Sequence, residues 1–270
     1  MKLYYFTKGL NILFSKFELL TGLGFTVRIS SPFSFIKLLN QKRKFIKQVG
    51  QNKKNIFPIK NLNAQYNDLN DSAGSLSHHY FWQDLYVAHQ VFKNNPEKHY
   101  DIGSSIQSFV AHVASYRKIH VFDIRPLDIN NKNIEFIQMD IMDSKKTEQF
   151  SNLESLSCLH TLEHFGLGRY GDPINYYGHE IGLKNMTNML KSGGQFYLSV
   201  PIGNQCIEFH AHRIFSIQYL IDILSPDFEI QKFSYINDKN KFFENVDYHE
   251  GLINNFKCRF GCGIFELIKK

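Results

Sequence analysis

The sequence lacks several features that would each define a class of protein. No uninterrupted apolar run reaches the roughly 18 residues of a transmembrane helix, so we expect no membrane-spanning helix. The apolar stretch 19–27 lies between Glu18 and Arg28, and no small-residue cleavage site follows a basic start, which argues against a signal peptide. The sequence shows neither an internal repeat nor a low-complexity tract. These absences favour a globular protein, which we expect in the cytoplasm.

Cysteine is also scarce. The chain has four cysteines, Cys158, Cys206, Cys258 and Cys262, and no two of them form a Cys-x-x-Cys pair. Cys258 and Cys262 are near neighbours, but no second pair completes a zinc set. We therefore expect reduced thiols in a reducing compartment rather than a disulfide framework.

The chain has only a modest excess of one charge. Lys and Arg number 31 against 25 Asp and Glu, a net charge of +6, which permits an anionic substrate or a membrane surface but requires neither. The basic residues are spread along the chain, so we expect no nucleic acid as a partner. A chain of 270 residues can bury a full core without staples, and its length suggests one large domain, with or without an appendage.

The first part of the chain differs from the rest. Segment 36–48 reads IKLLNQKRKFIKQ, and the spacing of Ile36, Leu39 and Phe45-Ile46 predicts a helix. We expect this helix to pack on the main domain; peripheral contact with a membrane surface or a partner protein is the alternative. Residues 51–77 are rich in Asn, Asp, Ser and Lys and are typical of an irregular connection. We therefore predict a helical and irregular N-terminal extension over residues 1–77.

From residue 78 onward, strand-like runs alternate with helical ones. Helical spacing predicts helices over 80–92, 106–114 and 181–190, the last closed by the helix stop 191–194. Strands are predicted over 98–102, 119–123, 134–139, 156–159, 195–200, 228–235 and 263–268. This alternation implies βαβ units. The prediction is a Rossmann-like α/β domain over residues 78–270, with a mostly parallel sheet and helices on both faces.

Acidic residues stand at the ends of three successive predicted strands. Asp101 precedes the turn at Gly103, Asp123 ends the second strand and Asp140 follows the third. Ligands of open α/β sheets bind at the carboxyl ends of the strands. A carboxylate at the second strand end can accept hydrogen bonds from both hydroxyls of a ribose.

Two classes of cofactor use such a site. A dinucleotide fingerprint requires further glycines where this chain has Ser105 and Ser108, which counts against a nicotinamide cofactor. S-adenosylmethionine has no pyrophosphate; its ribose suits Asp123, and Asp101 is a candidate partner for its amine. The predicted cofactor-binding residues are Asp101, Gly103, Ser105, Asp123, Ile124, Asp140 and Ile141.

Six stretches of the sequence carry a resemblance to a known family. They are HYFWQDLYVAHQVF (79–92), YDIGSS (100–105), VFDIRPL (121–127), LSCLHTLEHFGLGRYGDP (156–173), GGQFYLSVPIG (193–203) and EFHAHRIFS (208–216). They resemble class I methyltransferases, and more narrowly a methyltransferase-like family often encoded in bacterial surface-polysaccharide gene clusters. This resemblance covers residues 56–270. It implies a seven-stranded sheet with an antiparallel last strand and S-adenosylmethionine as the cofactor. The acceptor that it implies is a sugar, a nucleotide-linked sugar or a phosphate-type group of a capsule or lipopolysaccharide precursor.

Ionisable side chains follow the fourth and fifth predicted strands. An alcohol acceptor needs a base, and the candidate catalytic residues are His160, Glu163, His164 and His212. Among them His164 and His212 are preferred, and a structural histidine bonded to the backbone is the alternative for each. Arginine offers a bidentate fork for phosphate or carboxylate. The candidate substrate-binding residues are Arg169, Tyr170, Asp172 and Arg213, with Arg125 as a further arginine and surface ion pairing as the alternative.

A bound metal and two other functions are alternatives to a metal-free methyltransferase. His160 to His164 matches H-x-x-E-H, but it leaves a strand without a third ligand, so we exclude a zinc protease. A metal held by His160, Glu163, His164 and His212 is a minor alternative, and we predict no metal. The competing functions are a non-catalytic interaction module of polysaccharide assembly and, less favoured, a nicotinamide oxidoreductase. The sequence identifies neither the acceptor atom nor the oligomeric state.

Overall fold

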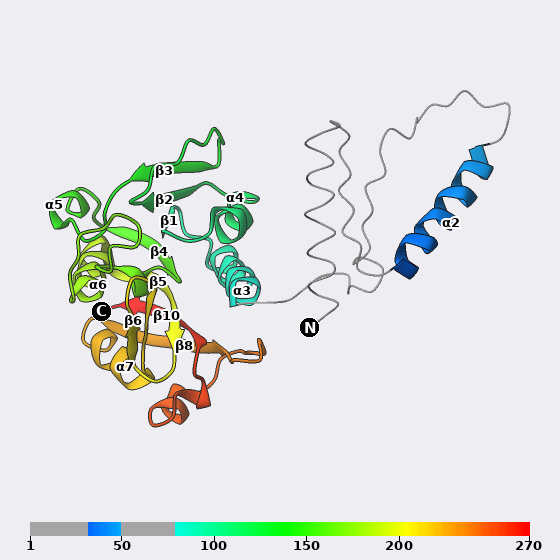
Figure 1. Ribbon diagram of the computed structural model, residues 1–270. Helices are drawn as coiled ribbons and strands as arrows, with labels where there is room; N and C mark the ends of the chain where they lie inside the picture. Colours follow the sequence, from blue (N-terminus) through cyan, green and yellow to red (C-terminus); the bar gives the residue numbers. More distant parts are fainter. Residues whose placement is uncertain (1–31, 50–78) are drawn as a thin grey trace. The chain divides into compact units, whose positions relative to one another are not determined.

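The structure is a computed structural model that describes residues 32–49 and 79–270 (Figure 1). The chain divides into two compact units, Met1–Ser75 and Leu76–Lys270. The irregular connection expected over 51–77 and the apolar stretch 19–27 lie outside the described residues. The domain boundary between residues 77 and 78 stays a prediction.

Helix α2 (Pro32–Val49) is the part of the first unit that the structure describes. It contains the helix predicted over 36–48 and begins with a proline, whose fixed φ and missing N–H suit a first helical turn. Ile36, Phe45 and Ile46 are exposed. Among the described residues, no helix is both long and apolar enough to cross a membrane. What α2 packs against stays a prediction.

The second unit is built on a sheet of eight strands in the order β3-β2-β1-β4-β5-β10-β8-β9. The strands are β1 (His99–Ile102), β2 (Ile119–Asp123), β3 (Ile134–Gln138), β4 (Leu153–Leu159), β5 (Leu190–Ile202), β8 (Phe228–Ile236), β9 (Phe242–Phe243) and β10 (Gly261–Lys269). Strands β1 to β5 pair in parallel, whereas β10 is antiparallel to both β5 and β8. The Rossmann-like sheet with an antiparallel last strand is confirmed. It has one strand more than expected, because the chain turns back after β8 and β9 pairs with it.

Helices cover both faces of this sheet. They are α3 (His79–Asn94), the π-helical turn η1 (Ile106–Val110) continuing into α4 (Ala111–Ala114), α5 (Ser144–Thr147), α6 (Gly178–Met189) and α7 (Ile217–Leu224). Short 3-10 turns are η2 (Leu162–His164), η3 (Tyr248–Gly251) and η4 (Asn255–Lys257), and β6 (Cys206–Glu208) pairs with β7 (His212–Ile214) in a separate hairpin. The helices predicted over 80–92, 106–114 and 181–190 are confirmed; α7 and the hairpin were not predicted.

Neighbouring residues of a strand point to opposite faces, so one strand can contribute to two hydrophobic clusters. In β5, Leu198 belongs to the cluster that contains Met186 of α6. The next residue on its N-terminal side, Tyr197, belongs to the cluster that contains Val87 of α3 and Phe109 of η1. The predicted placement of helices on both faces is confirmed by these two clusters.

The helix stop at 191–194 has a second role. Helix α6 ends at Met189 as expected, but β5 already begins at Leu190. Strand β4 pairs first with Leu190 and then with Gln195, so residues 191–194 bulge out of the parallel pairing. The strand expected over 195–200 is therefore longer at both ends.

Helix α6 lies unusually close to the segment that follows β4. A Cβ atom on Gly182 would lie 2.2 Å from Cδ2 of Phe165. Glycine in a helix interior is unfavourable by about 1 kcal/mol relative to alanine, so this position keeps glycine for close approach. The contact holds α6 against the segment that carries Glu163 and His164.

We expect Gly182→Ala to lower the melting temperature. The gain in helix propensity, about 1 kcal/mol, is outweighed by the overpacking against Phe165, which typically costs about 1–3 kcal/mol. The double variant Gly182→Ala with Phe165→Leu should recover part of the loss. Asn188→Ala, at an exposed position of α6, is the control and should leave stability nearly unchanged. Thermal unfolding measures all four proteins, and a Gly182→Ala protein as stable as the wild type would contradict this account.

Candidate functional site

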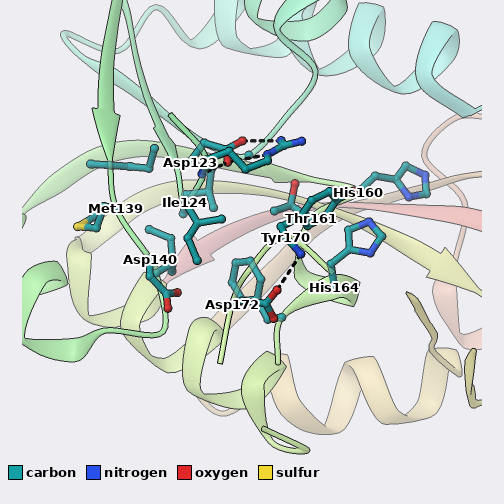
Figure 2. A pocket seen from close by; sticks show the side chains of 15 residues that line it. Asp123, Ile124, Met139, Asp140, His160, Thr161, His164, Tyr170 and Asp172 are labelled. Atoms are coloured by element: carbon teal, nitrogen blue, oxygen red, sulfur yellow. Dashed lines mark hydrogen bonds and ion pairs between the residues drawn. The ribbon is translucent and has the colours of Figure 1, made fainter. Parts of the chain in front are cut away.

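A cleft of about 540 Å³, here called the inner cleft, opens at the carboxyl ends of β1 to β4 (Figure 2). The cleft lies where the strand order reverses between β1 and β4, the place where open α/β sheets bind ligands. Five predicted cofactor-binding residues line it: Gly103, Asp123, Ile124, Asp140 and Ile141.

The chain leaves β1 through a turn that requires glycine. Gly103 has a φ of +63°, in the left-handed region that side chains disfavour. A Cβ atom there would lie 2.6 Å from Cγ2 of Thr161, the second residue after β4. The Gly103 amide donates to the carbonyl of Phe122 at 2.8 Å, which fixes the turn against β2. The floor of the inner cleft is therefore backbone from β1 packed on Thr161.

Asp101 lies beneath this turn and does not line the cleft. It is fully buried and stands opposite Ser157 of β4 in the sheet. Its Oδ1 accepts from the hydroxyls of Ser104 (2.6 Å) and Ser157 (2.5 Å), and its Oδ2 accepts from the Ser104 amide at 3.0 Å. Ser105 also lies outside the lining of the inner cleft. The structure thus places Asp101 as the support of the turn.

Asp123 faces the inner cleft and is held by Arg125. Its Oδ1 accepts from the amide and Nε of Arg125 at 2.8 and 3.0 Å, and its Oδ2 accepts from Nη2 at 2.7 Å. A carboxylate has about four acceptor positions, so a diol that binds both oxygens must replace part of this pairing. The half-exposed guanidinium of Arg125 also lies 4.5 Å from the ring centre of Tyr170.

Apolar side chains and one further acid complete this side of the cleft. Figure 2 shows Asp123, Ile124, Met139 and Asp140 on one side of the cleft, with His160 and His164 on the other. Oδ1 of Asp140 accepts from the Met142 amide at 2.8 Å, and burial raises the pKa of its carboxyl. A flat apolar group with one polar edge would suit these surroundings.

A second, larger hollow, here called the outer cleft, has a volume of about 850 Å³ and lies beside the first. His160, His164 and Tyr170 line both clefts. The outer cleft also receives most of the other predicted catalytic and substrate-binding residues: Glu163, Arg169 and His212. A ligand in one cleft can therefore contact a ligand in the other at this shared boundary.

His164 is positioned as a neutral base at that boundary. Its Nδ1 lies 2.7 Å from the carbonyl oxygen of Ala211, which can only accept, so Nδ1 carries the proton. The lone pair is therefore on Nε2, which lies 3.8 Å from Oε1 of Glu163. Burial lowers the pKa of His164, so its imidazole stays neutral at neutral pH.

His160 and Glu163 form a buried pair next to it. Nδ1 of His160 lies 2.9 Å from Oε1 of Glu163, and both side chains are almost fully buried. His160 has a φ of +49°, which turns its side chain out of the direction of β4. His160 of this pair lines both clefts, and Glu163 behind it is buried in the domain.

Two predicted substrate-binding residues, Arg213 and Asp172, have partners within the protein. Arg213 is buried and donates to the carbonyls of Glu163, Phe165 and Tyr176, lining neither cleft. Asp172 lines the inner cleft and accepts from the amides of Gly168 and Tyr170 at 3.0 and 3.1 Å. Both side chains shape the glycine-containing loop after β4.

The predicted substrate side chains Arg169 and Tyr170 pack together, and His212 lies apart from the other histidines. The guanidinium of Arg169 is 5.1 Å from the ring centre of Tyr170, and its Nη1 donates to Ala211. His212 lies 3.5 Å from a Glu208 oxygen, and its ring centre is 4.9 Å from that of Phe260 with the two rings tilted by 49°. Within the described residues, the structure therefore does not gather the metal set His160, Glu163, His164 and His212 that the sequence offered as an alternative.

Sequence reasoning missed several residues that line the outer cleft. They are His79, Tyr80, Asp238, Asn240, Arg259 and Phe260, from the start of α3 and from the segments on either side of η3 and η4. His79, Tyr80, Arg259 and Phe260 do not follow a predicted parallel strand, so the pattern that identified the other candidates carried no signal for them. Asp238 and Asn240 do follow the strand predicted over 228–235, and the same pattern could have found them.

Strand order, the antiparallel β10 and helices on both faces define a Rossmann-like α/β fold with a ligand cleft at its switch point. The chain belongs to the family described as Caenorhabditis protein of unknown function, DUF268, whose model matches residues 105–252. No curated protein matches the sequence.

Solved structures share this fold at low sequence identity. The [4+2]-cyclase SpnF has a TM-score of 0.51 and 11% identity, covering 73% of this chain and 85% of SpnF. A SAM-dependent methyltransferase from Anabaena variabilis has a TM-score of 0.47 and 13% identity over 71% of this chain and 86% of its own. The N-methyltransferase NodS from Bradyrhizobium japonicum, in complex with S-adenosyl-l-homocysteine, has a TM-score of 0.43 and 13% identity, covering 72% and 94%. At such identities the similarity shows the fold alone, and one fold hosts different reactions.

The buried carboxyl of Asp101 should make the free energy of unfolding depend on pH. Burial raises the pKa of its carboxyl from 3.8 to about 6, because desolvation outweighs the hydrogen bonds from Ser104 and Ser157. Between these values the folded protein keeps a proton that the unfolded chain has released. The stability that this proton contributes is complete below about pH 3.8, decreases up to about pH 6 and is absent above it.

Asp101→Asn cannot lose this proton, so its stability should not decrease over that window. The free energy of unfolding of Asp101→Asn relative to the wild type should rise by roughly 2–3 kcal/mol from pH 4 to pH 7, measured by urea unfolding. Asp128→Asn, at an exposed position, is the control and should show no such trend. A difference between Asp101→Asn and the wild type that is independent of pH would show that Asp101 titrates normally.

Proposed function

We propose that this protein is an S-adenosylmethionine-dependent methyltransferase, with the cofactor in the inner cleft and the acceptor in the outer cleft. The observation that carries this proposal is the boundary that the two clefts share, at His160, His164 and Tyr170. Asp123 stands on the other side of the inner cleft from His160 and His164 (Figure 2). One site therefore receives a ribose at one end and an acceptor at the other.

The inner cleft fits the parts of this cofactor better than those of a dinucleotide. Asp123 can accept hydrogen bonds from the ribose hydroxyls when these replace part of its pairing with Arg125. Asp140 can accept a hydrogen bond from the adenine amine, beside the apolar Ile124. A pyrophosphate needs close approach of backbone, which Ser105 and Ser108 do not favour. In this proposal Asp101 supports the turn, because both of its oxygens already accept hydrogen bonds.

The side chains at the boundary supply positioning and a base. When bound, the cofactor supplies an electrophilic methyl group, which passes to an acceptor oxygen while the C–S bond breaks and leaves its electron pair on sulfur. Nε2 of His164 takes the proton that the acceptor hydroxyl loses. The walls of the two clefts hold the acceptor in line with the methyl group, and such positioning supplies about 7–11 kcal/mol.

The outer cleft favours a polar acceptor. Glu208, His212, Arg169, Asp238 and Arg259 place charged or ionisable groups of both signs around it. We propose a hydroxyl of a sugar, a nucleotide-linked sugar or a phosphate-type group as the acceptor, in the synthesis of a surface polysaccharide. The polysaccharide context is supported by the sequence stretches that resemble methyltransferases of such gene clusters.

Two measurements test this function. Calorimetric titration with S-adenosylhomocysteine should show one site, and a methyl-transfer screen against nucleotide-activated and phosphorylated sugars should reveal a product by its mass. Absence of binding heat would favour a non-catalytic module, and binding of a nicotinamide cofactor instead would point to an oxidoreductase.

We expect Asp123→Ala to weaken binding of S-adenosylhomocysteine by about ten- to a hundred-fold, because a hydrogen bond to a charged group contributes about 1.5–3 kcal/mol. The fold should persist, since the side chain of Asp123 bonds to exposed Arg125. Calorimetry measures the dissociation constant, with Asp128→Ala at an exposed position as the matched control. An unchanged dissociation constant for Asp123→Ala would remove the ribose assignment.

We expect His164→Ala to lower turnover by about 10²–10⁴-fold while cofactor affinity stays unchanged, because a general base is lost. Burial lowers the pKa of His164, so wild-type turnover should fall only below its ordinary value of 6.5, and the variant should lack this acid limb. Steady-state rates over pH measure both effects, with His112→Ala, an exposed histidine, as the control. Lower activity that tracks a lower melting temperature would instead make His164 a structural residue.

A further inference from the structure

Three side chains from distant parts of the chain meet at the inner end of the outer cleft. His79 begins α3, His160 directly follows β4 and Cys262 is the second residue of β10. All three are buried, and one nitrogen or sulfur atom of each lies within 4.8 Å of the others. In the part of the chain that the structure describes, this is the only group of its kind among His, Cys, Asp and Glu.

The spacing of the nitrogens matches that of metal ligands. Nδ1 of His79 lies 3.2 Å from Nε2 of His160. Zinc binds imidazole nitrogen at about 2.0–2.1 Å, so two nitrogens at a tetrahedral angle stand roughly 3.3 Å apart. The two nitrogens, which lie within hydrogen-bond distance of each other, therefore have the separation of two ligands of one ion once both lone pairs turn toward it. A thiolate is a preferred third ligand for zinc.

A buried carboxylate lies behind the central ligand. His160 uses its other ring nitrogen, Nδ1, to bond Oε1 of Glu163 at 2.9 Å. Metal-binding histidines commonly pass their second nitrogen to a carboxylate, which orients the ring and raises its basicity. Oε2 of Glu163 is buried without a hydrogen-bond partner. One thiolate and this carboxylate would together balance the charge of a divalent cation.

The fold explains how these residues reach one place. Strand β10 runs antiparallel to β5, so its first residues lie at the edge where β4 and β5 end, with Cys262 opposite Pro201. The positive φ of His160 turns its side chain at the end of β4, and its amide donates to the Ser199 carbonyl of β5 at 3.0 Å. A strained residue held by its surroundings is a common feature of a ligand site.

We propose that His79, His160 and Cys262 bind one zinc ion, with a fourth position open to the outer cleft. His79 and His160 line that cleft, and three protein ligands with one open position are the arrangement of catalytic zinc sites. On binding, the thiol of Cys262 releases its proton to solvent. This set shares only His160 with the metal set considered from the sequence, and it replaces the prediction of no metal.

An open position at this place has a use that rests on the proposed function. It faces the cleft assigned to the acceptor, next to His164. A hydroxyl bound to zinc is more acidic than one in water, so the ion and His164 would act on the same acceptor oxygen. The binding of the metal itself does not depend on methyl transfer.

The test uses the full chain without a histidine tag, stripped by a chelator and dialysed against zinc. We expect one zinc per chain by atomic emission. Titration with cobalt(II) should produce the near-ultraviolet sulfur-to-cobalt charge-transfer absorption of a thiolate ligand. Cys262→Ser should lose that absorption, and Cys258→Ser, which removes another buried cysteine, should keep it. Loss of a residue that only orients a metal ligand lowers metal affinity by about 10–100-fold. Because His79 is proposed as a ligand itself, His79→Gln should weaken zinc binding by more than this.

The outcomes separate the metal site from the proposed function. A wild-type chain that binds no stoichiometric zinc, or a Cys262→Ser chain with unchanged affinity and absorption, overturns the site. If Cys262→Ser does not fold, the wild-type cobalt spectrum and His79→Gln decide. Titration of the same samples with S-adenosylhomocysteine is an independent measurement. A protein that binds S-adenosylhomocysteine but no zinc rejects the metal site alone. A protein that binds zinc but no S-adenosylhomocysteine supports the metal site and rejects the proposed function.

Discussion

A fully buried carboxylate joins the parts of this domain on which the clefts depend. Asp101 accepts hydrogen bonds from Ser104 in the turn after β1 and from Ser157 in β4. A buried charge or acid without such partners is strongly unfavourable, so these bonds keep β1, its turn and β4 in one arrangement. Gly103, held in that turn, packs against Thr161. The floor of the inner cleft and the start of the loop after β4 are thereby set together.

The loop after β4 carries the groups at the boundary of the two clefts, and it is anchored mainly through its backbone. Arg213 of β7 donates to the carbonyls of Glu163 and Phe165. Burial lowers the pKa of its guanidinium, against the opposing charges of Asp172 and Glu180, and its two Nη atoms donate to carbonyl oxygens. Arg213 therefore positions the base candidate His164 and the His160–Glu163 pair without itself lining either cleft.

Much of the fold and one side of the site could be predicted from local patterns. The strand over 119–123 has the predicted bounds, because alternating apolar residues report a half-buried strand and its ends. Asp123 and Asp140 were accessible to the same reasoning, since a polar residue just after a parallel strand lies at the carboxyl edge. Asp101 met the same criterion, yet its side chain points beneath the turn, because the pairing partner Ser157 offers it a hydroxyl.

The sequence by itself determined the α/β class, the succession of the parallel strands along the chain and the residues at the ends of these strands, because these follow from periodicity and from the residues next to each strand. Only the tertiary structure decided that His79, His160 and Cys262 lie together. It also decided that Arg213 donates hydrogen bonds to the backbone of the loop after β4 instead of binding a ligand. Cys262 reaches the carboxyl edge because β10 runs against its neighbours. Its direction is chosen by hydrogen bonds and packing between segments far apart in the chain, and no local pattern of residues reports these.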